Sequence, residues 1–252
     1  MVKRDTKELE LALHELDTVT IPELVRPAVA HFDPPTDELV IWAVKVYIYS
    51  ALCQFRELLR ATLTLVDEGH ISAVFFCCRG LFELAAHAYY VKKHVLQYMK
   101  VKNLGLAWQF LFEVNLGSRD MREKQMAQSG EAIYPEGPHI AKVMACFNEY
   151  FPNGHKAKQA TETYSSLSEF SHPNCFAFIN HFEWETDLRN MPKVTFGKPS
   201  ENLLTLCLPA GCMAVASFLD ASGKLAGALG DGELFKTLEA IIEDVLESAK
   251  SE

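Results

Sequence analysis

The sequence lacks the short motifs that most nucleotide-binding and hydrolytic enzymes carry. Its 252 residues contain neither G-x-x-x-x-G-K-[ST] nor G-x-G-x-x-G, the glycine-rich loops that hold phosphates. H-E-x-x-H, typical of zinc proteases, and G-x-S-x-G, the nucleophile turn of α/β-hydrolases, are also missing. The common nucleotide cofactors and hydrolase mechanisms therefore have little support, and we expect no cofactor.

Positive charge is scarce. Lys and Arg number 24 against 33 Asp and Glu, so the formal net charge is −9. On average such a surface repels phosphate backbones, which argues against duplex DNA as a partner. A local basic cleft would still be compatible with RNA.

Paired cysteines and a long apolar segment are also lacking. The seven cysteines are odd in number and contain no C-x-x-C, which favours reduced thiols in a cytoplasmic protein. The first residues are charged and amphipathic, unlike a signal peptide. The apolar run over residues 203–219 includes Pro209 and is shorter than the roughly 20 residues of a membrane span. We therefore expect a buried helix there and no membrane partner.

What the sequence does contain is apolar residues at helical spacing, which predicts an all-α fold, a multi-helix bundle. Thr36 is a good N-cap for a long helix to about Val66, and Gly69 suits the left-handed position that ends it. A second long helix, about 71–100, is apolar nearly all round and should be central. Further helices are predicted over residues 104–128, 140–151, 156–170, 203–229 and 234–249.

The N-terminal part differs from the rest. Residues 1–35 are predicted to form a helical arm laid on a single bundle domain of residues 36–252. The arm contains one short helix over 5–17, and Thr20 with Pro22 has the pattern of a second helix start. A partly alternating pattern about 176–197 predicts one small β-hairpin.

The central helix carries polar residues in an apolar setting. Arg79, Glu83 and His87 are four residues apart and share one stripe, which Tyr90 and His94 extend. Arg79 and Glu83 can form an ion pair that offsets the cost of burying either charge. The stripe is either a polar seam that fixes the register of the helices or a pocket inside the bundle where a ligand binds.

A second polar group lies near residue 170. Tyr164, Ser168 and His172 also recur every four residues, and Asn174 follows Pro173. An imidazole beside a fixed hydroxyl and near Arg79 can act as a general base or acid. Alternatively, His172 caps or cross-links the end of its helix.

Metal binding has less support. Glu169 and His172 form an E-x-x-H, the spacing of di-iron bundles, but such sites use two copies. The other copy, Glu136 to His139, lies in a Gly-Pro loop that cannot present both ligands from one helical face. We therefore expect no metal site.

The segments Arg79-Gly80-Leu81-Phe82-Glu83-Leu84 and Tyr164 to Pro173 resemble motifs of a known group. These are uncharacterised bacterial all-helical proteins with R-x-x-x-E on a central helix and L-S-x-x-x-H-P on a later one. Their layout is similar to the HEPN superfamily (higher eukaryote and prokaryote nucleotide-binding). The resemblance covers roughly residues 36–185. It implies a HEPN-like core of four or five helices, often dimeric, with roles in RNA cleavage or phage defence.

The chain departs from the active members of that superfamily. HEPN ribonucleases carry an Arg-x4–6-His motif, and His172 matches its histidine. Residues 165–168, where the arginine should lie, are Ser, Ser, Leu and Ser. Arg79 could supply the positive charge only if the fold brings it to His172.

Two hypotheses follow, and whether the protein is an enzyme at all stays open between them. In the first, which we favour, it is a HEPN-like binding or interaction protein, a homodimer acting in stress response or phage defence. Its polar site would consist of Arg79, Glu83 and His172, with His87, Tyr164, Ser168 and Asn174 contacting a small-molecule or RNA ligand. In the second, it is a metal-independent ribonuclease with His172 as the general base.

Overall fold

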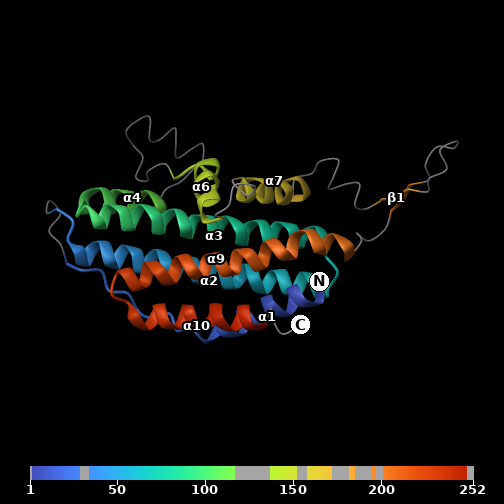
Figure 1. Cartoon of the computed structure of the whole chain (residues 1–252), viewed down its shortest axis with the longest axis horizontal. Helices are drawn as coiled ribbons and strands as arrows, with labels where there is room; N and C mark the ends of the chain where they lie inside the picture. The colour runs from blue at the N-terminus through green and yellow to red at the C-terminus, as the bar shows by residue number, and fades with distance from the viewer. Residues whose placement is uncertain are drawn as a thin grey trace.

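The computed structural model describes residues 2–28, 34–116, 137–151, 158–171, 182–184, 194–196 and 201–248. Most of them are helical, which confirms the predicted all-α bundle (Figure 1). The α-helices within these ranges are α1 (Val2–Thr18), α2 (Asp37–Asp67), α3 (Ile71–Lys100), α4 (Leu104–Leu116), α6 (Ile140–Phe147), α7 (Gln159–Ser171), α9 (Leu204–Ala228) and α10 (Gly232–Ser248). Two single 3₁₀ turns, Asn148–Tyr150 and Glu201–Leu203, adjoin α6 and α9.

The boundaries of the two longest helices follow from local chemistry. The hydroxyl of Thr36 accepts a hydrogen bond from the backbone N–H of Leu39 at 3.3 Å, which caps the start of α2. Gly69 adopts a φ of +72°, the left-handed conformation that glycine takes without steric cost, in the turn to α3. Both assignments confirm the sequence prediction.

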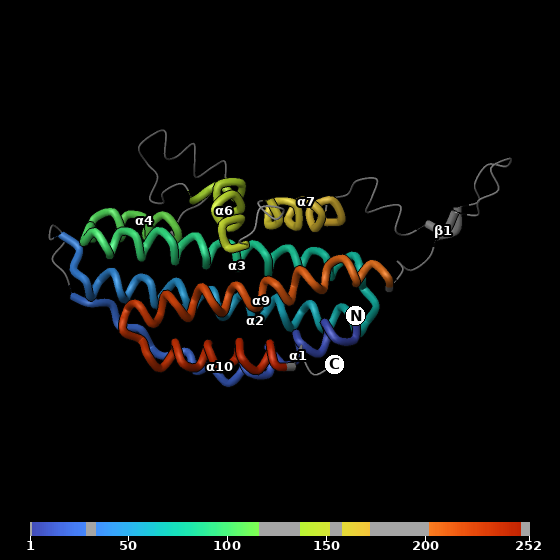
Figure 2. Tube along the Cα trace, in the orientation of Figure 1, coloured from blue at the N-terminus to red at the C-terminus, as the bar shows by residue number. Residues whose placement is uncertain are grey.

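Helix α3 is the centre of the bundle. It packs against α9 and α2 on one side and against α4, α6 and α7 on the other (Figures 1 and 2). Helices α1 and α10 lie beyond α9, on the side away from α7. Residues from helices distant in the sequence therefore meet along α3.

The core consists of large apolar side chains from these layers. Phe55 of α2 stacks on Phe218 of α9, with ring centroids 4.2 Å apart and ring planes within 8°. At Gly211 of α9 a Cβ atom would lie 3.6 Å from Sγ of Cys78 in α3 and 3.7 Å from Leu9 in α1. Both distances are ordinary van der Waals contacts, so α1, α3 and α9 meet at this position.

The described part of residues 1–35 contains one helix, α1. Leu9, Ala12 and Leu16 are fully buried, because α1 packs against α9, α2 and α10. The prediction of a second helix start at Thr20 is wrong, since residues 19–28 are not helical. Pro22 has no N–H to donate, and Pro27 disfavours helix in the residue before it, so too few residues remain for a stable helix between them.

The remaining predictions concern shorter elements. The strands β1 (Phe182–Trp184) and β2 (Val194–Phe196) pair antiparallel within the range predicted for a hairpin, with Phe182 opposite Phe196. The structure describes α4 as far as Leu116, and the rest of the helix predicted over 104–128 lies outside the described residues.

Three of the described helices are long and apolar enough to cross a membrane by length and composition alone: α2, α3 and α9. Helix α9 has 25 residues, so it is longer than the apolar run that the sequence analysis judged too short for a span. Half of the residues in the most apolar stretch of α2 are buried inside the bundle. The buried share is also 50% in α3, and it is 61% in α9.

Candidate functional site

The stripe of polar residues on α3 forms the ion pair that its spacing predicts. Nε of Arg79 donates to Oε1 of Glu83 at 2.9 Å, one helical turn away. The Arg79 side chain is 24% exposed and that of Glu83 32%, so the pair lies at the edge of the core. Water reaches both groups, and a ligand could reach them as well.

The structure adds a partner that the sequence analysis did not connect with this pair. A terminal nitrogen of Arg79 donates to the hydroxyl of Tyr164 in α7 at 2.9 Å. The guanidinium carbon also lies 5.2 Å from the centroid of the Tyr164 ring, within cation–π range. Arg79 therefore joins α3 to α7 through a side chain that is already engaged with a carboxylate.

The surroundings of Arg79 keep it charged. Partial burial acts to lower its pKa, but the hydrogen bonds and charges of Glu83 and Tyr164 outweigh burial, and the pKa is raised overall. The guanidinium therefore stays a cation at every physiological pH. We refer to Arg79, Glu83, His87, Tyr164 and Ser168 as the α3–α7 cluster.

His87 extends the cluster along α3. It is half-buried, and burial lowers its pKa, which the negative charge of Glu83 partly opposes. A neutral imidazole carries one donor and one acceptor, so His87 can hydrogen-bond a polar ligand in either sense.

Ser168 contributes a polar atom that is unsatisfied. Its hydroxyl oxygen, one helical turn beyond Tyr164, is buried and has no hydrogen-bond partner among the residues that the structure describes. Buried hydroxyls usually have a partner, since leaving one without costs about 1–3 kcal/mol. A ligand or a bound water could form the missing hydrogen bond with this hydroxyl.

The extension of the stripe to Tyr90 and His94 belongs to different surroundings. The ring centroid of His94 lies 4.5 Å from that of Tyr90 and 5.1 Å from that of Phe110 in α4. Burial, together with the positive charges of Lys142 and Lys93, lowers the pKa of His94. These residues form an aromatic contact between α3 and α4, separate from the α3–α7 cluster.

The remaining predicted site residues, His172 and Asn174, lie outside the described residues. Of the seven predicted site residues, the structure thus brings Arg79, Glu83 and Tyr164 into direct contact and places His87 and Ser168 one turn from them. Within the described ranges, no group of three or more His, Cys, Asp or Glu side chains could hold a metal ion.

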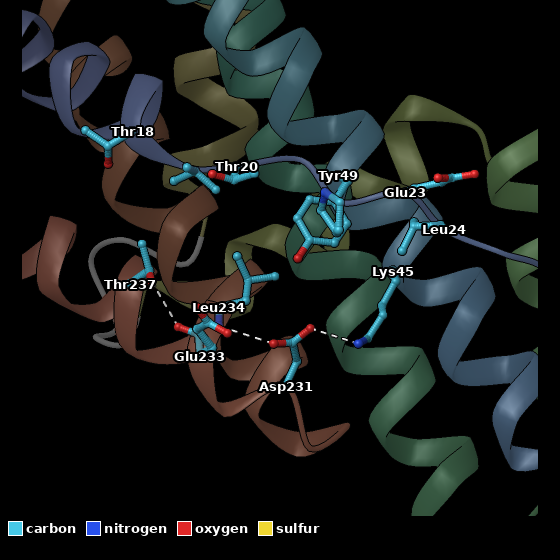
Figure 3. Close-up of a pocket in the computed structure, with 12 residues that line it drawn as sticks. Thr18, Thr20, Glu23, Leu24, Lys45, Tyr49, Asp231, Glu233, Leu234 and Thr237 are labelled. Atoms are coloured by element: carbon cyan, nitrogen blue, oxygen red, sulfur yellow. Dashed lines mark hydrogen bonds and ion pairs between the residues drawn. The ribbon is translucent and has the colours of Figure 1, made fainter.

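A pocket that the sequence did not indicate is shown in Figure 3. It lies beside α10, on the side of the bundle away from α7 (Figure 1). Its volume is about 590 Å³, and its walls are residues 18–24, helix α2 and the start of α10. Nζ of Lys45 lies 3.0 Å from a carboxylate oxygen of Asp231 in its wall. The capping pattern at Asp231 is readable in the sequence, but nothing local connects it with Lys45, far away in α2.

Comparison with protein-family models, curated proteins and solved structures finds no match to this chain. The fold and the cluster therefore define it as an all-α multi-helix bundle with a partly exposed Arg–Glu–Tyr contact between its central helix and α7.

Proposed function

We propose that this protein is a HEPN-like binding or interaction protein that holds a small polar ligand or a partner at the α3–α7 cluster, without turnover. The observation that carries the proposal is the state of Arg79. Its guanidinium is engaged with the carboxylate of Glu83 and the hydroxyl of Tyr164, each at 2.9 Å.

This arrangement suits binding better than ribonuclease chemistry. A catalytic arginine must offer its donors to a phosphate whose negative charge increases in the transition state. Here the carboxylate of Glu83 occupies the place beside Arg79 that the phosphate would need, and its negative charge repels a phosphate. The net charge of −9 acts in the same direction. The resemblance to HEPN proteins supports the fold and a role in stress response or phage defence, whereas the missing motif arginine argues against cleavage.

An exposed aromatic residue supports an interaction role. Phe76 is 56% exposed and lies seven residues before Glu83, so the two share one face of α3. A large exposed apolar side chain beside a polar cluster is typical of a contact surface. We propose that the partner at this face is a second copy of the chain, in line with the dimers that the resemblance implies.

The proposed location is the cytoplasm. Lys92 of α3 lies 3.8 Å from Asp220 of α9, and Lys224 lies 2.6 Å from the same carboxylate. These charges interrupt two of the three helices that are apolar enough for a span, and they favour a bundle packed in water.

A ribonuclease assay tests the absence of turnover. Wild-type protein is incubated with mixed cellular RNA in the presence of EDTA, next to the His172→Ala variant, with both checked for folding by circular dichroism. We expect no cleavage by either protein. Cleavage by the wild type that is lost in His172→Ala would overturn the proposal in favour of the metal-independent ribonuclease.

The contact surface is tested by the mass of the protein in solution, measured by light scattering. We expect the wild type to be a dimer and Phe76→Glu to be a monomer. The matched control is Leu246→Glu, which adds the same charge to an apolar residue of α10 that is 48% exposed. A monomeric wild type, or a dimer that survives Phe76→Glu, would contradict a dimer through this face.

A further inference from the structure

The pocket beside α10 has walls that come from three parts of the chain (Figure 3). Thr20 and Leu24 belong to the extended segment after α1, Tyr49 belongs to α2, and Leu234 belongs to α10. Arg56 of α2 holds the start of this segment in place. Its guanidinium donates to the backbone carbonyl of Leu16, at the end of α1, at 3.1 Å and to that of Val19 at 3.3 Å. The pocket is thus part of the folded arrangement of α1, α2 and α10.

Negative charge exceeds positive charge in this pocket. Glu23, Asp231 and Glu233 line it together with one cation, Lys45, which is paired with Asp231. Asp231 also accepts a hydrogen bond from the backbone N–H of Leu234 at 3.2 Å, so it caps α10. Neither Glu23 nor Glu233 forms an ion pair with any described residue. A ligand with positive charge would therefore complement the pocket.

Tyr49 provides a second, independent indication of a ligand. The residue is only 8% exposed, and Figure 3 shows its hydroxyl pointing into the pocket, towards the start of α10. No described residue forms a hydrogen bond with this hydroxyl. Burial, with the charges of Asp231 and Glu233, raises the pKa of Tyr49, so the phenol stays neutral. It can accept a hydrogen bond from an ammonium group and donate one to a carboxylate.

The apolar part of the wall limits the class of cation. Val19, Leu24 and Leu234 line the pocket together with the charged residues, and Val19 and Leu234 are buried. A bare metal ion would leave this apolar surface unused, and no described cluster has the ligands for one. Methylene groups between two ammonium groups would cover it, and the volume of about 590 Å³ accommodates such a chain.

We propose that this pocket binds a linear aliphatic polyamine, with one ammonium group between Tyr49 and the carboxylates of Asp231 and Glu233 and its methylene chain against Leu24 and Leu234. The site is separate from the α3–α7 cluster and does not depend on the function proposed for that cluster. Tyr49 acts as a binding residue because its hydroxyl contacts the ammonium group. Glu233 supplies charge at the rim.

Titration calorimetry with spermidine at about 150 mM NaCl tests the proposal, since salt at this level screens weak surface attraction. We expect saturable binding to one site by the wild type. Tyr49→Phe removes one hydrogen bond to a charged group and should raise the dissociation constant about tenfold. Glu233→Gln removes charge at an exposed rim position and should raise it about threefold.

The matched control is Glu239→Gln, which makes the same charge change at an exposed residue of α10 outside the pocket and should leave the affinity within about twofold. As a control ligand, 1,4-butanediol has a similar chain without charge and should not bind. Absence of saturable binding would overturn the proposal. So would an equal loss of affinity in Glu239→Gln and Glu233→Gln, which would show non-specific attraction to an acidic surface.

Discussion

The α3–α7 cluster and the pocket beside α10 both place a tyrosine next to charged side chains, but they differ in how those groups are satisfied. At the cluster, Arg79 pairs with Glu83 and with the hydroxyl of Tyr164. In the pocket, carboxylates exceed cations, and the hydroxyl of Tyr49 has no partner among the described residues. Polar groups that satisfy each other stabilise the fold, so a ligand at the cluster would be held by His87 and by the unsatisfied hydroxyl of Ser168. In the pocket, the carboxylates of Glu23 and Glu233 and the hydroxyl of Tyr49 are available to a ligand.

The largest effect should come from removing the central cation of the cluster. Arg79→Met leaves the half-buried carboxylate of Glu83 without its partner and should lower the free energy of unfolding by about 1–2 kcal/mol. Arg60→Met is the matched control, because Arg60 pairs with Asp17 at 2.8 Å where both side chains are about half exposed. It should cost about 0.5 kcal/mol or less in urea unfolding. Equal losses would mean that the cluster contributes no more than a surface ion pair.

The same substitution in both regions tests the comparison directly. Tyr164→Phe removes a hydrogen bond from Arg79 and should lower the free energy of unfolding by about 1 kcal/mol. Tyr49→Phe breaks no hydrogen bond between described residues and should leave the unfolding midpoint almost unchanged. If Tyr49→Phe destabilised the protein as much as Tyr164→Phe, its hydroxyl would have a structural role, and the difference between the two regions would disappear.

The smallest effect concerns pH. Because burial lowers the pKa of His87, the folded state binds a proton less readily than the unfolded chain. Stability should therefore fall as the pH drops below the ordinary histidine value of about 6.5. In urea unfolding at a series of pH values between 7 and 5, His87→Asn should lose less stability than the wild type. The control His14→Asn, at an exposed position of α1, should follow the wild type, and an unchanged profile in His87→Asn would contradict the assignment.

Local sequence signals were sufficient to predict most of the helices of the fold. The ends of α2 and α3 follow from Thr36 and Gly69, because caps and left-handed turns depend on neighbouring residues only. The Arg79–Glu83 pair is equally local, at one helical turn. The pattern at Thr20 predicted a helix that does not form, because a cap followed by a proline starts a helix only if enough helix-compatible residues follow, and Pro27 prevents that.

The contacts that define the two sites could not be predicted from the sequence, because they join residues far apart in the chain. Tyr164 was predicted as a site residue from its spacing on α7, but its bond to Arg79 joins residues 85 positions apart and depends on how α7 packs on α3. Tyr49 of α2 and Asp231, which caps α10, are even further apart in the chain, and no motif connects them. Such pairs become visible only when the packing of the helices is known.

The junction at Gly211 has a consequence for the order in which the chain folds during synthesis. Helix α1 is synthesised long before α9, whose Gly211 packs beside Leu9. At about 5–20 residues per second, α1 must wait on the order of 10 s or longer for that surface to be made. Helix α2 is made much earlier and can cover part of α1, but the contact of Leu9 with α9 cannot form before then, so this junction should be among the last contacts of the fold to form.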